Sequence, residues 1–107
     1  IGVKLTKEHS KRRKGDLAEY YAVTWLWDNG YEVFKNCGCD GMIDFIVRDS
    51  KGNIKLVDVK TFGKDRRNKK MYLTTLPKRT DAQKKAGVEY LGFRPDNRKL
   101  RWINHGK

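Results

Sequence analysis

Apolar residues follow a helical period in residues 15–29 and gather into short β-branched and aromatic runs after residue 30. Recurrence every three or four positions predicts an amphipathic helix over 15–29. Asp16 in its first turn suits the helix dipole, and Asn29 followed by Gly30 predicts its end. The apolar stripe of this helix is expected at Leu17, Tyr20, Tyr21, Thr24 and Trp27, widened by Ala18, Ala22, Trp25 and Leu26.

The β-branched and aromatic runs predict strands, because residues that favour turns separate them. A short helix is expected over 81–86, since Thr80 and Asp81 suit its beginning and Gly87 its end. The resulting order, α-β-β-β-β-α-β-β, predicts an α/β (α+β) fold with a mixed β-sheet flanked by helices. The strands are expected at 31–35, 43–47, 54–59, 71–76, 88–93 and 100–103.

Length and charge bound the class of protein. A chain of 107 residues, 37% of them hydrophobic, suffices for one domain with a single core, which we expect to cover residues 1–107. The 25 Lys and Arg exceed the 13 Asp and Glu by +12. Such a charge favours a nucleic-acid partner, because a polyanion relieves the self-repulsion of a small basic domain. An anionic membrane surface, or a basic domain without a polyanion, is the alternative.

The cations are concentrated in an arm over residues 1–13, a loop over 62–70 and the second predicted helix. We expect these segments to contact phosphates, which would make DNA binding dependent on salt and largely independent of sequence. For the arm, a solvated and partly frayed segment is an equally compatible interpretation. The expected phosphate contacts are Lys11, Arg12, Arg13, Lys14, Lys64, Arg66, Arg67, Lys69, Lys70, Lys84 and Lys85.

Cysteine usage favours an intracellular protein, cytoplasmic or nucleoid-associated. Cys37 and Cys39 are separated by one glycine, so a disulfide between them would be strained, and no second Cys or His pair has zinc-ligand spacing. We expect two reduced thiols, with metal binding or redox sensing as the alternative. No apolar run reaches transmembrane length, so no membrane contact of that kind is expected.

Two predicted strands carry charged residues where core side chains are expected. Because side chains alternate along a strand, Asp58 and Lys60 lie on one face and Val59 on the other. Asp44 on the adjacent strand would join them, and carboxylate oxygens favour a divalent cation. A sheet salt bridge between Asp44 and Lys60 is the alternative, although converging charges are costly to bury. Glu19, taken alone, is interpreted as a half-buried carboxylate that pairs with Lys14 or has no particular partner.

Together, Glu19, Asp44, Asp58 and Lys60 resemble the signature of the PD-(D/E)xK nuclease superfamily. The surrounding residues, KGDLAE at 14–19, GYEV at 30–33, IDF at 43–45 and VDVKT at 57–61, are similar to the archaeal-type Holliday junction resolvases. The match extends over residues 14–61. It departs from the family at Ile43, where proline is usual, and at Asp58, where glutamate is commoner.

This resemblance implies a restriction-endonuclease-like core that hydrolyses phosphodiester bonds with Mg²⁺ or Mn²⁺. Asp44, Asp58 and the Val59 carbonyl would bind the ion, and Glu19 would support it through water. Lys60 would orient the attacking water or neutralise charge on the phosphate, with the ion lowering the pKa of that water. The resemblance also implies a homodimer and, less directly, a contact of Gln83 with the nucleophile or the phosphate.

Three functions remain open from the sequence. The first is a structure-selective endonuclease that cuts branched DNA as a Holliday junction resolvase does. The second is a nicking or recombination-linked endonuclease that acts on duplex or other DNA. The third is a nucleic-acid-binding module that has a nuclease scaffold but no catalytic turnover. Trp25, Trp27 and Trp102 are expected in the core, with stacking on bases as the alternative.

Overall fold

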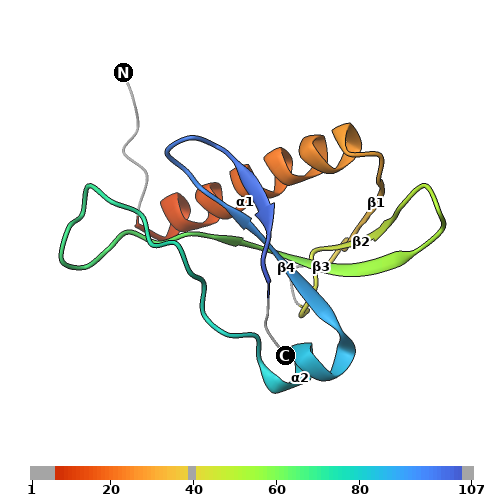
Figure 1. Cartoon of the computed structure of the whole chain (residues 1–107). Helices are drawn as coiled ribbons and strands as arrows, with labels where there is room; N and C mark the ends of the chain where they lie inside the picture. Colours follow the sequence, from red (N-terminus) through yellow and green to blue (C-terminus); the bar gives the residue numbers. More distant parts are fainter. Residues whose placement is uncertain (1–6, 39–40, 105–107) are drawn as a thin grey trace.

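The computed structural model describes residues 7–38 and 41–104 of the chain, with side chains from Ser10 onward. Two helices and five strands follow one another in the order α-β-β-β-α-β-β (Figure 1). They are α1 (Lys7–Asp28), β1 (Glu32–Lys35), β2 (Phe45–Arg48), β3 (Ile54–Thr61), α2 (Asp81–Ala86), β4 (Val88–Phe93) and β5 (Leu100–Trp102).

The five strands form one mixed sheet in the order β1-β2-β3-β4-β5. Neighbouring strands are antiparallel, except that β3 and β4 run parallel from the Leu56–Val88 pair to the Thr61–Phe93 pair. A parallel pair needs a crossover connection, which here contains α2. The mixed sheet flanked by helices is therefore confirmed.

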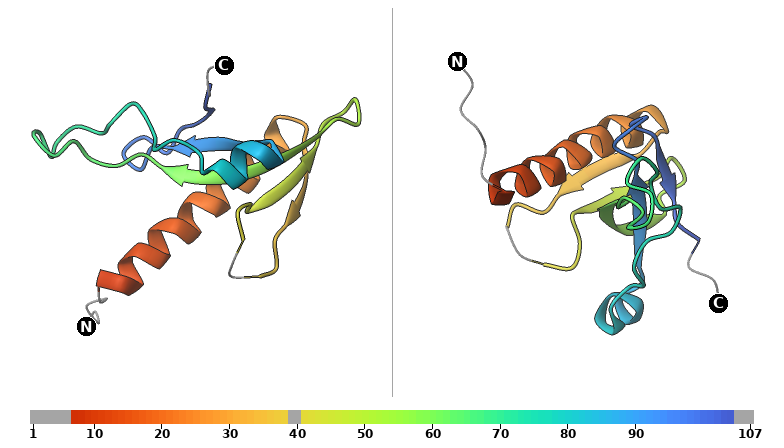
Figure 2. Two further views of the ribbon diagram at one scale, coloured as in Figure 1. Left: turned by 90° about the horizontal axis from the view of Figure 1, so that it is seen from below. Right: turned by 90° about the vertical axis from the view of Figure 1, so that its left-hand side faces the viewer.

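The core lies between α1 and one face of the sheet. Figure 2 shows α1 along this face, whereas the segment before α2 runs over the opposite face. Trp25 and Trp102 pack against the core with their rings 6.1 Å apart and edge to face, so these two tryptophans do contribute to it, as expected. The fully buried members of the cluster are Ala22, Leu26, Phe45, Val47, Val57 and Leu91.

The first helix is longer than predicted, and only part of its predicted apolar stripe is buried. It begins at Lys7, so residues 7–13 of the expected basic arm are helical, whereas residues 1–6 lie outside the described residues. Consecutive cations near a helix N-terminus interact unfavourably with the helix dipole, so the sequence did not indicate that the helix begins at Lys7.

The buried stripe of α1 is Ala18, Ala22 and Leu26, one residue in every four. By contrast, Tyr20 is 71% exposed and Trp27 is 62% exposed, so the expected core role of Trp27 is wrong. Small alanine side chains allow the helix backbone to approach the sheet closely. The larger aromatic residues are left at the flanks, which hydrophobicity alone does not reveal.

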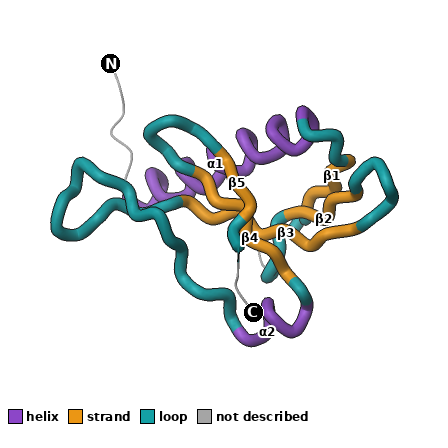
Figure 3. The backbone as a smooth tube through the Cα atoms, in the orientation of Figure 1, coloured by secondary structure: helices purple, strands orange, loops and turns teal. Residues whose placement is uncertain are grey.

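Residues 71–76 do not form the predicted strand. The chain turns back on itself after β3, with one isolated bridge between Lys64 and Tyr72 and a hydrogen bond from the Leu73 amide to the Gly63 carbonyl. Figure 3 shows this connection as loop throughout. The composition of this segment favours extended backbone, but it lies over a face of the sheet instead of beside a strand edge, so it gains no ladder of hydrogen bonds.

The predicted turns and caps of the other elements are confirmed. Gly52 in the β2–β3 turn has φ 87°, and Gly30 after α1 has φ 84°. Thr80 and Gln83 form a reciprocal capping box at the start of α2, which ends at Gly87 in the left-handed conformation. Among the described residues, no helix is both long enough and apolar enough to cross a membrane.

Candidate active site

Asp44 lies beside the part of β3 that has no partner strand on that side. Strand β2 begins at Phe45 opposite Val57, so the part of β3 beyond Val57 has no β2 partner. The Asp44 amide donates to the Val57 carbonyl at 2.8 Å. Its Oδ2 then accepts a hydrogen bond from the Val59 amide at 2.7 Å. The Asp44 carboxylate therefore occupies the place of the next backbone carbonyl.

Asp58 and Lys60 lie on one face of β3, as predicted. Lys60 Nζ lies 3.3 Å from Asp58 Oδ2 and 5.6 Å from the centre of the Tyr90 ring. The Val59 side chain packs against the core on the opposite face. A strand residue's amide and carbonyl point in the same direction, so the Val59 carbonyl faces the same edge as its amide, toward Asp44.

Gln83 of α2 is buried beside Asp58, and its side-chain amide is fully hydrogen-bonded. Nε2 donates to Asp58 Oδ2 and to the Met42 carbonyl, both at 3.1 Å. Oε1 accepts from the Tyr90 hydroxyl at 2.6 Å and from the Thr80 amide at 3.1 Å. These four bonds fix the orientation of the amide, because exchanging its nitrogen and oxygen would break those to Thr80, Met42 and Asp58, and only the Tyr90 hydroxyl could accept instead of donate.

Sequence reasoning missed Tyr90 and the Met42 carbonyl. One signal was present for Tyr90, because a tyrosine in a buried strand needs a hydrogen-bond partner for its hydroxyl. The sequence pattern gave no indication of which partner it finds. The Met42 carbonyl leaves no trace in the side-chain pattern, since backbone groups are the same for every residue.

Glu19 reaches the same cleft from α1. Partial burial raises the pKa of its carboxyl, Lys35 lowers it, and the negative charges of Asp16 and Asp58 raise it further. The alternative pairing with Lys14 is not found, since no ion pair in the described ranges involves either residue. Glu19 instead lines the same cleft as Asp44 and Asp58.

Burial raises the pKa of Asp44 to about 7. The Val59 amide acts against this shift, whereas the adjacent Asp58 carboxyl and the more distant Glu19 add to it. Two adjoining carboxyl groups in a partly buried position repel each other when both are ionised. Near neutral pH this position therefore favours a proton or a cation between them.

The donor atoms fit a small hard cation. The Val59 amide bonds to Asp44 Oδ2, Gln83 and Lys60 contact Asp58 Oδ2, and the two carboxyl groups lie within hydrogen-bond reach of each other. With the Val59 carbonyl they form an all-oxygen set. In the described parts of the chain, no three Asp, Glu, His or Cys side chains lie close enough to hold an ion together. Two carboxylates suffice for Mg²⁺, which usually keeps several waters.

These residues line a cleft of about 480 Å³. Its walls come from α1, from the segment before β2, from the end of β3 and from α2. The sequence-predicted site residues that line it are Glu19, Asp44, Asp58, Val59, Lys60 and Gln83. The structure thus brings together all of the side chains expected to take part in catalysis.

The cations expected to bind DNA are exposed, but they lie on three separate elements. Lys11 to Lys14 are on the first half of α1, and Lys84 and Lys85 are in the last turn of α2. Lys64 to Lys70 lie on the loop after β3. In Figures 1 and 2 this loop and the start of α1 project beyond the same end of the sheet.

Only one of the two cysteines can be described. Cys37 is an exposed free thiol, in agreement with the expected reduced state, whereas Cys39 lies outside the described residues.

No family model matches the chain, and no curated protein matches it in sequence. The fold is similar to that of a bacterial homing endonuclease, I-Ssp6803I, with a TM-score of 0.64 at 18% sequence identity. The similarity covers 86% of this chain and 63% of the endonuclease chain, so this chain spans less than two thirds of that protein. At this level of identity the likeness establishes the fold, and it confirms the predicted fold class.

Proposed function

We propose that this protein is a DNA endonuclease that hydrolyses phosphodiester bonds with a divalent cation. The observation that carries the proposal is the pair of adjoining carboxyl groups, Asp44 and Asp58, in an open cleft beside Lys60. Such a pair stabilises the fold poorly by itself, because burial and mutual repulsion oppose its ionisation. The similarity of the fold to a homing endonuclease supports the same class of reaction.

Each side chain would have a separate role in this reaction. Asp44, Asp58 and the Val59 carbonyl would hold Mg²⁺ or Mn²⁺, and Glu19 would support it through water. The bound ion supplies Lewis-acid chemistry, which polarises the phosphate and makes a nearby water more acidic. Lys60 would place its ammonium beside the phosphate and neutralise the developing charge.

Gln83 would act by orienting Asp58. Its amide donates to Asp58 Oδ2 and is itself held by Thr80 and Tyr90, so it restricts the rotation of the carboxylate. We expect this role to be more important than a direct contact with the nucleophile, because both hydrogens of Nε2 are already donated within the protein.

The positive charge of the protein supports DNA as the substrate. The exposed cations lie on α1 and α2, which contribute to the walls of the cleft, and on the loop after β3, and a net charge of +12 favours a polyanion. Phosphate contacts of this kind do not read base sequence. We propose branched DNA as the preferred form and a homodimer as the active species, with nicking of duplex DNA as the second candidate.

The test is cleavage of a labelled four-way junction and of a linear duplex, with the same concentrations of Mg²⁺ and salt. Wild type is compared with Asp58→Asn and with Asp96→Asn, an identical change at an exposed carboxylate in the β4–β5 turn. We expect paired cuts in the junction by wild type and Asp96→Asn, and none by Asp58→Asn. Equal rates on both substrates would reject the preference for branched DNA. Binding without cleavage, in Mg²⁺ and in Mn²⁺, would indicate the non-catalytic module instead.

A further inference from the structure

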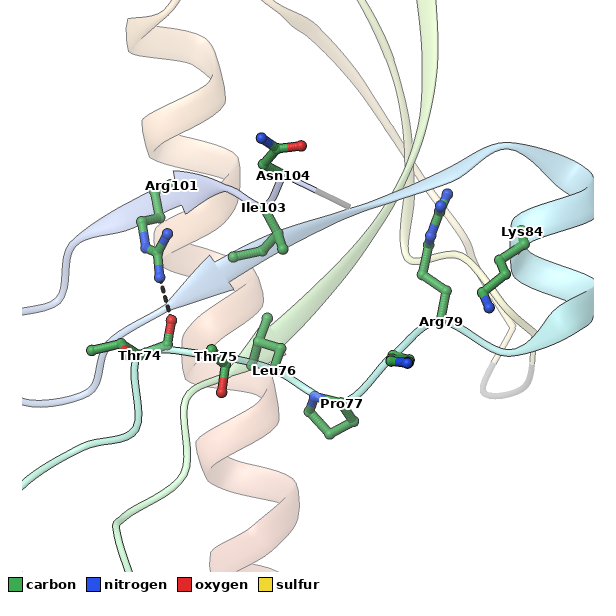
Figure 4. A pocket seen from close by; sticks show the side chains of 10 residues that line it. Thr74, Thr75, Leu76, Pro77, Arg79, Lys84, Arg101, Ile103 and Asn104 are labelled. Carbon is green, nitrogen blue, oxygen red and sulfur yellow. Dashed lines mark hydrogen bonds between the residues drawn. The ribbon is translucent and has the colours of Figure 1, made fainter. Parts of the chain in front are cut away.

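A second cavity lies on the sheet face opposite α1, away from the candidate active site. It has a volume of about 650 Å³ and lies between the segment at residues 74–79 and the end of β5 (Figure 4). Ile103 and Leu76 give it an apolar lining. Ile103 lies on this face because its side chain covers Gly92, whereas Trp102 packs on the α1 side.

Four cations surround this apolar lining, namely Lys78, Arg79, Lys84 and Arg101. No carboxylate lines the cavity, and none of the four takes part in an ion pair within the described residues. Their positive charges are therefore not neutralised by neighbouring side chains. A cavity of this composition attracts anions.

The two arginines are held in place by backbone carbonyls. Arg101 Nη2 donates to the Thr74 carbonyl at 2.6 Å, and its guanidinium lies 5.0 Å from the centre of the Phe62 ring. Arg79 Nη1 donates to the Val88 carbonyl at 3.0 Å. Each guanidinium keeps further N–H groups for a ligand, and little side-chain freedom is left to lose when one binds.

We infer that this cavity binds the sugar-phosphate backbone of DNA. A DNA strand presents anionic phosphates and apolar sugar surfaces in alternation, which corresponds to cations around an apolar lining. An acidic peptide would offer charge without a repeating apolar group of that kind. Of the four cations, only Lys84 was expected at a DNA interface from the sequence, so Lys78, Arg79 and Arg101 are new contacts.

The position of the cavity relative to the active site follows from α2. Gln83 points into the candidate active site, and Lys84, the next residue, lines the basic cavity. DNA that occupies both would therefore cross α2. This inference rests on the proposed function, because it concerns how the same DNA substrate is held.

The test measures DNA binding without cleavage, by fluorescence anisotropy of a labelled duplex in EDTA at about 50 to 200 mM NaCl. Lys78→Gln/Lys84→Gln removes two exposed charges from the cavity. The matched control, Lys51→Gln/Lys99→Gln, removes two exposed charges from turns outside it. Circular dichroism checks that both variants fold, and Arg101→Gln provides an independent cavity variant.

Loss of two phosphate contacts should reduce the slope of log affinity against log salt by about 1.8 and lower the affinity roughly tenfold or more. The control should change both quantities much less. If wild type binds DNA but cavity and control variants behave alike, the inference is overturned while the proposed function stands. If wild type binds no DNA, both fail. Equally strong, cavity-dependent binding of poly-glutamate would also overturn the inference.

Discussion

The Tyr90 hydroxyl donates a 2.6 Å hydrogen bond to Gln83 Oε1, and this bond connects the parallel strand pair to the candidate active site. Through the same amide, Gln83 Nε2 reaches Asp58 Oδ2. Strand β4, helix α2 and strand β3 are thus joined at one buried position. The orientation of the Asp58 carboxylate therefore depends on Tyr90 through the Gln83 amide.

Tyr90→Phe should therefore affect stability modestly and activity more. The variant loses one buried hydrogen bond, which lowers the free energy of unfolding by about 1 kcal/mol. Gln83 Oε1 then keeps only the Thr80 amide, so the side-chain amide is less firmly oriented. Urea unfolding and junction cleavage measure the two effects. Tyr31→Phe is the control, since the hydroxyl of this half-buried tyrosine has no hydrogen bond within the described residues. Equal loss of activity in both variants would contradict the role of Tyr90.

Asp44 should make the metal-free protein less stable as the pH rises. Its pKa is about 7 in the folded protein, against an ordinary value of 3.8. Between these values the folded state retains a proton that the unfolded state has lost, so the free energy of unfolding falls as the pH increases. Asp44→Asn lacks this titration and keeps an acceptor for the Val59 amide.

Asp44→Asn should therefore gain stability over wild type as the pH rises from 4 to 8, by about 1–2 kcal/mol once the partial exposure of the carboxyl is considered. Urea unfolding in EDTA at a series of pH values measures this difference. A difference that stays constant over the series would show that the two carboxyl groups do not interact as described.

Divalent cations should stabilise the folded protein through the same two carboxylates. At a free concentration about ten times the dissociation constant, binding adds roughly 1.4 kcal/mol, which raises Tm by about 4–8 °C in a domain of this size. Thermal unfolding of wild type and Asp96→Asn with Mn²⁺ or Mg²⁺ should show this increase. Asp44→Asn and Asp58→Asn should lose it; an increase retained in both would place the ion elsewhere.

Two glycines should respond in opposite ways to alanine. A Cβ at Gly92 would lie 2.7 Å from the Phe62 ring and 2.9 Å from Ile103 Cδ1, so Gly92→Ala should cost about 1–3 kcal/mol. Gly15 lies within α1 with no atom inside 4 Å of such a Cβ. Gly15→Ala should stabilise the protein by about 0.5–1 kcal/mol. Urea unfolding measures both, and a destabilised Gly15→Ala would argue against the helix before residue 15.

Several residues show which features of the structure could be predicted from the sequence. Thr80, Gly87, Gly30 and Gly52 marked the ends of their elements correctly, because caps and turns depend on a few neighbouring residues. Alternation along a strand was enough to place Asp58 beside Lys60. Local chemistry thus predicted most elements and the grouping of Asp44, Asp58 and Lys60, whereas Glu19 and Gln83 were expected at the site only from the resemblance to known nucleases.

Predictions from neighbouring residues failed where contacts with residues distant in the chain determine the structure. Residues 71–76 have the composition of a strand, yet the segment lies over a face of the sheet, makes one isolated bridge and remains a loop. Ala22, rather than Trp27, faces the sheet because close approach of α1 selects small side chains.

The sequence by itself determined the charge of this protein, its mixed order of helices and strands and the side chains of its candidate active site. Only the tertiary structure decided that Asp44 fills the open edge of β3, that Tyr90 orients Gln83, and that Arg79 and Arg101 share a cavity. The physical reason is that these contacts join residues far apart in the chain. Their geometry depends on strand register and helix position, which no local pattern of residues specifies.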